Sequence, residues 1–210
     1  MTSRPQATAR RKPASERLAE IIEAAAAIAV AEGLDRVTAK RVAAELGVFP
    51  GLVSHYFATA DELVATAFAH AAASEREQIF CHAVLADLPL DRMRRLLESW
   101  LHQDRDPVSL LWLDAWQGGR RRPALMAEVG RQMNADLERL SEIIADGIAA
   151  GEFPVDHPGQ PALQILSLVD GLSVQAATRE TIDYAPVRAM VVATAERLLA
   201  LPPGALARKP

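Results

Sequence analysis

The spacing of apolar and polar positions predicts helices along the whole chain. Between Ser15 and Gly33 the apolar residues recur every three or four positions, as in a helix that buries one face: Leu18, Ile21, Ile22, Ala25, Ile28 and Ala29. A capping box of Thr59 and Glu62 begins a second such pattern, which continues to Phe80. No strand-like alternation stands out, so we expect an all-α fold of about nine helices.

Residues 38–57 predict two short helices joined by a tight turn. Thr38 suits a helix N-cap, Gly47 suits the left-handed residue that ends a helix, and Pro50 suits a first helical position. Val53 and Phe57 fall on the inward face of the second helix. The residues left outside are small or uncharged, namely Pro50, Gly51, Leu52, Ser54 and His55. This surface is typical of a recognition helix that enters the major groove of DNA.

This segment resembles the TetR family of bacterial transcriptional regulators. The residues in register with the family's pattern are Gly47, Val48, Gly51, His55, Tyr56, Phe57, Asp61, Glu62 and Leu63. The variant GLVSHYF is similar to the branch that includes the choline-responsive BetI repressors. Three positions depart from the family's pattern. Phe49 stands where the family usually has a helix-capping serine, Ser54 where it often has a tyrosine that reads a base, and Ala60 where it usually has a lysine that holds a phosphate. We expect a weaker cap, a changed sequence preference and slightly lower affinity at all sequences.

The second half also resembles the ligand-binding domain of BetI-type regulators, in WLDAWQGGRRRPAL from Trp112, GEF from Gly151 and LVDGLSVQ from Leu168. The resemblance implies a cytoplasmic homodimer, most simply a repressor that a small-molecule inducer releases from a palindromic DNA operator. We expect a basic disordered arm at 1–14, a DNA-binding domain at 15–58 and a ligand-binding and dimerisation domain at 59–210. The alternatives are an activator, a regulator without a ligand, and a small-molecule binding protein or enzyme without a DNA function.

The DNA contacts are assigned by chemistry and by the resemblance. Base reading falls to Ser54 and His55, with Lys40 from the preceding helix, while Phe49, Pro50 and Leu52 would touch thymine methyl groups. Thr38, Gly51 and Tyr56 would contact the phosphate backbone. Arg41 is either a further contact or a surface charge.

Two further sets of residues are candidates for the ligand and dimer surfaces. The ligand pocket would be lined by rings, thioethers and leucines, which otherwise form plain core: Trp100, Leu111, Trp112, Trp116, Met126, Met133 and Leu137. The resemblance places the dimer contact on the last two helices, where the candidates are Leu163, Leu166, Val169, Asp170, Gly171 and Val174.

Charge and composition limit the other classes of function. Residues 1–57 hold eight Lys or Arg against six Asp or Glu, although the net charge of the chain is −4. The basic side is therefore N-terminal, as DNA binding requires. The single cysteine, Cys81, excludes an internal disulfide and is expected to be a small buried hydrophobe. The sequence shows no signal peptide and no membrane span, so we expect no membrane partner. It also shows no catalytic motif, no cofactor-binding loop and no histidines at metal-ligand spacing, so we expect no enzyme.

Overall fold

Nine α-helices and two short 3₁₀ helices make up the described residues, 13–176 and 183–207, of the computed structural model. They are α1 (Ala14–Glu32), η1 (Leu34–Arg36), α2 (Ala39–Leu46), α3 (Pro50–Tyr56), α4 (Ala60–Val84), α5 (Pro89–Trp100), η2 (Gln103–Arg105), α6 (Asp106–Gly119), α7 (Pro123–Ala149), α8 (Gly159–Ala176) and α9 (Ala185–Leu198). The prediction of an all-α fold with about nine helices is confirmed. The expected arm lies outside these ranges, except for its last two residues.

The ends of α2 follow from the capping residues. The Thr38 hydroxyl accepts a hydrogen bond from the Arg41 amide at 3.1 Å. Gly47 takes the left-handed conformation, with φ 65°, and both its amide and that of Val48 donate to the carbonyl of Ala43. These bonds satisfy carbonyls that the end of a helix leaves open, so the chain can turn at once into α3.

A capping box begins α4. The Thr59 hydroxyl accepts from the Glu62 amide at 3.1 Å, and the Glu62 carboxylate accepts from the Ala58 amide at 2.9 Å. The helix then continues to Val84, four residues beyond the predicted Phe80. One helix therefore leads from the helix-turn-helix to the far part of the molecule.

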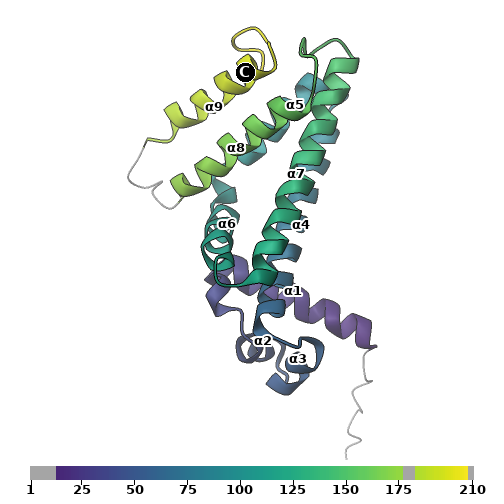
Figure 1. The fold of residues 1–210 in the computed structure, drawn as a ribbon, viewed down its shortest axis with the longest axis vertical. Helices are drawn as coiled ribbons and strands as arrows, with labels where there is room; N and C mark the ends of the chain where they lie inside the picture. Colours follow the sequence, from purple (N-terminus) through teal and green to yellow (C-terminus); the bar gives the residue numbers. More distant parts are fainter. Residues whose placement is uncertain (1–12, 177–182, 208–210) are drawn as a thin grey trace, which may run out of the picture.

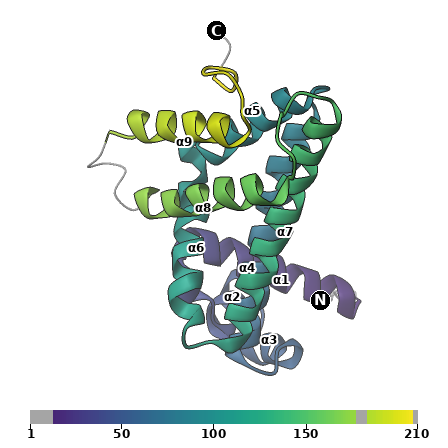
Figure 2. The same ribbon diagram turned by 45° about the horizontal axis from the view of Figure 1, so that its top comes forward.

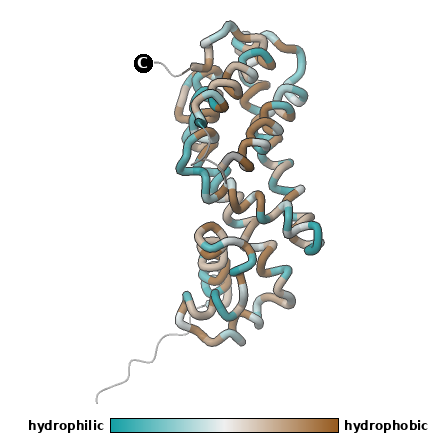
Figure 3. The backbone as a smooth tube through the Cα atoms, turned by 90° about the vertical axis from the view of Figure 1, so that its left-hand side faces the viewer, coloured by the Kyte–Doolittle hydropathy of each residue, from teal (hydrophilic) through white to brown (hydrophobic). Residues whose placement is uncertain are grey.

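The helices form two units along an elongated molecule. Helices α1, α2 and α3 lie at one end, while α4 and α7 run side by side toward the other end (Figure 1). Helices α8 and α9 pack together along one edge of the second unit, which lies at the end of the molecule away from α2 and α3 (Figures 1 and 2). Hydrophobic and hydrophilic stretches alternate along the helices of both units (Figure 3).

Each unit has its own apolar core, but the first core is not confined to α1–α3. It surrounds Ile21, Val53 and Phe68, and α6 and α7 contribute Trp112 and Leu125 to it. The second core joins the far half of α4 to α5, α7, α8 and α9. The helix-turn-helix therefore belongs to the same core as α6 and α7, which begin at Asp106 and Pro123, well after α3 ends at Tyr56.

The GEF sequence has a packing role. A Cβ atom on Gly147 would clash with the ring of Phe153, which is buried, so only glycine fits at this point of α7. Gly151 turns the chain with φ 72°, and the Glu152 carboxylate accepts from the Leu90 amide at 2.8 Å. The motif fastens the end of α7 to the start of α5.

The prediction for Cys81 is wrong, because its side chain is exposed on α4. Ile79, Phe80 and Ala83 take the core positions of that turn, which places Cys81 on the outer face of the helix. None of the described helices is long and apolar enough to cross a bilayer.

Candidate functional site

The outward face of α3 is open to solvent. Ser54 and His55 are exposed, whereas Val53 and Phe57 are buried beneath them. The His55 ring packs edge-on against Tyr56, with ring centroids 5.5 Å apart, and Tyr56 in turn packs against the first core. His55 is thus directed outward from a fixed support, as side chains that contact base edges must be.

An exposed apolar group stands at the start of α3. Phe49 occupies the N-cap position, makes no side-chain cap and is 86% exposed. Pro50 beside it is exposed, and Leu52 is half-buried. The Phe49 ring is therefore free of contacts that the fold requires and is available to a partner molecule.

The space around Gly51 also fits close approach by a partner. A Cβ atom built on this residue would meet no protein atom within 4 Å. Packing within the chain therefore does not require glycine here. Thr38, by contrast, already uses its hydroxyl as the cap of α2, although its side chain remains exposed.

The cations of α2 have different surroundings. Arg41 forms ion pairs with Glu32 at 2.5 Å and Glu45 at 2.8 Å, and the hydrogen bond from Arg41 lowers the pKa of Glu32. Lys40 is exposed, and no carboxylate of the described residues pairs with it. Arg41 is therefore paired with carboxylates of α1 and α2, and Lys40 presents its charge to solvent.

Contacts that the sequence did not suggest connect this unit to α6 and α7. The Asp114 carboxylate of α6 accepts from the Leu34 amide of η1 at 3.3 Å. Arg122, after α6, lies 3.4 Å from Asp35, while Arg120 is exposed. These partners are 80 and 87 residues apart, so no local sequence pattern links them.

The seven candidate pocket residues are not brought together. Leu111, Trp112, Trp116 and Met133 belong to the first core, Trp100 and Leu137 to the second, and Met126 is 40% exposed. The rings of Trp112 and Trp116 lie 5.7 Å apart. Two cavities are found elsewhere in the protein, one between α1, α4 and α6 and one between α5 and α9. None of the seven candidate residues lines either cavity.

The first of these cavities, of about 500 Å³, lies between α1, α4 and the start of α6. Ala27 and Val30 line it from α1, Glu75 from α4, and Arg105 and Val108 from η2 and α6. A molecule in this cavity, here named the interdomain cavity, would touch both units of the protein.

Five ionisable side chains gather beside this cavity. Glu75 Oε1 lies 2.8 Å from Arg105 Nε, and Arg76 lies 3.4 Å from Asp136. Burial raises the pKa of Glu75, raises that of Asp136 to about 7 and raises that of Asp170 to about 6, against the opposing charge of nearby arginines. Three partly buried carboxyl groups therefore share two guanidinium groups, and we call the set of Glu75, Arg76, Arg105, Asp136 and Asp170 the buried charge cluster.

Asp170→Asn is expected to stabilise the protein more at pH 8 than near pH 4.5. The folded-state pKa of Asp170 is raised from 3.8 to about 6, so this group lowers stability progressively as pH rises across that interval. The gain at pH 8 should be on the order of 2 kcal/mol. Thermal melting at fixed protein concentration measures it, with exposed Asp156→Asn as the control. Equal gains at both pH values would contradict the argument.

The candidate dimer residues divide between two faces of α8. Leu163, Gly171 and Val174 are exposed on the outward face. Leu166 and Val169 are buried in the second core, and Asp170 is partly buried as part of the buried charge cluster. The exposed Met190 of α9 adds a residue that the sequence did not single out.

Comparisons with known proteins agree with this architecture. The chain is 28% identical over 169 residues to the HTH-type transcriptional regulator BetI of Paraburkholderia phymatum, covering 77% of this chain and 81% of the relative. A TetR transcription regulator from Haloarcula marismortui superposes with a TM-score of 0.72 at 21% identity, covering 89% of this chain and 97% of that one. A protein from Saccharomonospora viridis, solved in complex with choline, gives 0.69 at 19% identity, with 84% and 94% covered.

Two family models account for most of the chain. Residues 21–67 match the bacterial regulatory proteins of the tetR family, and residues 89–200 match the C-terminal domain of BetI-type transcriptional repressors. The first match contains the helix-turn-helix, and the second contains α5 to α9. The chain thus belongs to the TetR family of transcriptional regulators, in its BetI-type branch.

Proposed function

We propose that this regulator is a cytoplasmic repressor whose homodimer binds a palindromic operator and is released by a small molecule. The exposed Ser54 and His55 on α3, beside the uncovered Phe49, carry the proposal. Residues 15–58 form the DNA-binding domain in this view, and 59–210 the ligand-binding and dimerisation domain. Ser54, His55 and Lys40 read bases, while Thr38, Gly51 and Tyr56 contact phosphates.

Dimerisation uses the outward face of α8 and α9. Leu163 and Val174 on α8 are 55% and 54% exposed, and Met190 on α9 is 50% exposed. Gly171 lies between the α8 residues and leaves room for a second helix to approach. Pairing through a two-fold axis would bury these apolar side chains and present two α3 helices to successive major grooves.

The interdomain cavity is the proposed effector site, and a small organic cation is the proposed effector. Three partly buried carboxyl groups against two guanidinium groups favour a cation, and Glu75 of this set lines the cavity. The choline bound to the similar Saccharomonospora viridis protein supports this class. Since α1 forms one wall, a bound cation would shift α1 against α4 and change the spacing of the two α3 helices.

Selection of binding sites from random duplex DNA tests the function directly. The expected result is an inverted repeat bound by one dimer, with choline, as the first probe, weakening binding to the wild-type protein more than to Glu75→Gln. Selection that yields no specific sequence would favour the alternative of a binding protein without DNA function. Transcription from the selected site, with and without the protein, separates a repressor from an activator.

Leu163→Glu is expected to convert the dimer to a monomer and to weaken operator binding by more than about tenfold, because a buried unpaired carboxylate destabilises an interface. Leu163 is 55% exposed within one chain, so the fold should be unchanged. Sedimentation and fluorescence anisotropy measure the two effects. Leu88→Glu, at a residue with 53% exposure outside α8 and α9, is the matched control and should remain dimeric.

His55→Ala is expected to weaken operator binding by about 1–3 kcal/mol and to relax the preference at one base pair. The reason is that a base-edge contact discriminates among bases, whereas a phosphate contact does not. Binding to the selected operator and to its single-base variants measures this. His157→Ala, in an exposed loop, is the control. Uniform weakening on all duplexes would assign His55 to the backbone instead.

A further inference from the structure

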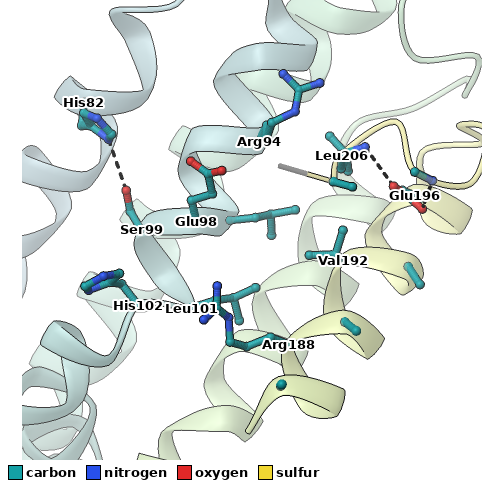
Figure 4. Close-up of a pocket in the computed structure, with 16 residues that line it drawn as sticks. His82, Arg94, Glu98, Ser99, Leu101, His102, Arg188, Val192, Glu196 and Leu206 are labelled. Atoms are coloured by element: carbon teal, nitrogen blue, oxygen red, sulfur yellow. Dashed lines mark hydrogen bonds between the residues drawn. The ribbon is translucent and has the colours of Figure 1, made fainter. Parts of the chain in front are cut away.

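A second and larger cavity lies between α5, α9 and the C-terminal segment (Figure 4). Its volume is about 940 Å³, within the range of roughly 300–1,000 Å³ that is typical of small-molecule sites. Apolar walls are supplied by Leu97 of α5, by Leu101 just after it, by Val192 of α9 and by Leu206. We call it the α5–α9 cavity.

The C-terminal wall of this cavity is held by buried polar contacts. The Glu196 carboxylate, 5% exposed, accepts from the Gly204 amide at 3.0 Å and from the Leu206 amide at 2.9 Å. Arg94 donates to the carbonyl of Ala205 at 2.8 Å. Two elements therefore fix this segment in place, and the cavity has a defined shape.

The proposed dimer contact would leave this cavity open. Helix α9 turns Val191 and Ala195 toward the second core and Met190 outward. Arg188 and Val192 lie on a third side, which faces α5 across the cavity (Figure 4). A partner on the outward face would not fill the space between α5 and α9.

The charges at the two ends of the cavity differ. Glu98 lies toward Arg94, whereas Arg188 extends toward Leu101 and His102 (Figure 4). Arg94 also pairs with Asp91. Among residues 13–176 and 183–207, no carboxylate forms an ion pair with Arg188. The Arg188 end therefore offers an unpaired guanidinium beside an apolar wall.

We propose that the α5–α9 cavity binds an amphipathic organic carboxylate. Its apolar body would lie along Leu97, Leu101 and Val192, and its carboxylate would receive paired hydrogen bonds from Arg188, whose planar guanidinium matches a carboxylate in geometry. The proposal depends on this cavity alone. It holds whether or not the effector of the interdomain cavity is a cation.

Calorimetric titration of the full-length protein with decanoate, below its micellar concentration, tests the proposal. Saturable binding of one decanoate per chain is expected, with weaker binding of decanol and of decyltrimethylammonium, which has the same chain and the opposite charge. Arg188→Gln should weaken decanoate binding at least about tenfold, and Arg120→Gln, at an exposed arginine far from the cavity, should not change it.

A second variant fills the cavity instead of removing charge. Ala189 lines the cavity and is exposed, so Ala189→Trp should abolish decanoate binding without disturbing the core, as circular dichroism melting would verify. Absence of decanoate binding to the wild type would overturn the proposal. So would equal affinity in the wild type, Arg188→Gln and Ala189→Trp, or tighter binding of the cationic amphiphile.

Discussion

Ser54→Glu is expected to abolish specific operator binding, with a loss of about 100-fold or more, while the melting temperature stays within about 2 °C of the wild type. Ser54 is exposed in the middle of α3 and makes no contact that the fold needs. A carboxylate placed there would meet the phosphates and the acceptor atoms of the major groove, and juxtaposed like charges cost several kcal/mol. Surface changes of this kind alter stability by only about 0.5 kcal/mol.

Two controls separate charge repulsion from a lost contact. Ser54→Ala removes the hydroxyl alone and should cost about 1–3 kcal/mol at one base pair of the site. Ala145→Glu adds the same charge on the exposed side of α7 and should leave DNA binding nearly unchanged. Fluorescence anisotropy with the selected operator gives all three affinities. If Ser54→Glu bound as well as Ala145→Glu, α3 would not be the recognition helix.

Arg105→Met is expected to lower the free energy of unfolding by about 3–5 kcal/mol at pH 8, because it leaves a buried carboxylate without its partner. Arg105 and Glu75 are 11% and 13% exposed and lie 2.8 Å apart, so the Glu75 carboxylate is poorly hydrated when the guanidinium is removed. Asp170 depends on the same arginine for its opposing charge. At about 2–4 °C per kcal/mol, the loss should lower the melting temperature by about 10 °C.

Two results would identify the carboxylates as the cause. The loss should shrink as pH falls from 8 to 5, since the folded protein then holds protons that neutralise Glu75 and Asp170, whose pKa values burial already raises. Glu75→Gln in the same chain should recover part of the loss. Arg120→Met, at an exposed site, should change little. An equal loss at both pH values, unrelieved by Glu75→Gln, would show that only packing was affected.

The sequence predicted the helix-turn-helix well because its boundaries depend on local chemistry. Thr38, Gly47 and Pro50 act on backbone groups within five residues of themselves, so neither the cap nor the stop of α2 required knowledge of distant helices. The outward positions of Ser54 and His55 followed from the same periodicity. The surface proposed for DNA contact was therefore accessible from pattern alone.

The polar pairings and the pocket depend on how distant helices meet. Trp100 and Trp112 look equivalent in sequence, yet each faces a different core. Glu75 and Arg105 are 30 residues apart, and nothing local indicates that they pair. Arg41 looks available for DNA in the sequence, but Glu32, nine residues earlier, lies beside it in the fold. Periodicity gives the face of a helix but not the neighbour that covers it.

The apolar core that α6 and α7 share with the DNA-binding end has a consequence for chimeric regulators. A chimera that exchanges only the first sixty residues would separate Ile21 and Val53 from Trp112 and Leu125, with which they share one interior. The recipient's own α6 would have to match a foreign α1. A new operator specificity should therefore be obtained by changing the outward residues of α3. Replacement of the whole DNA-binding domain should fail.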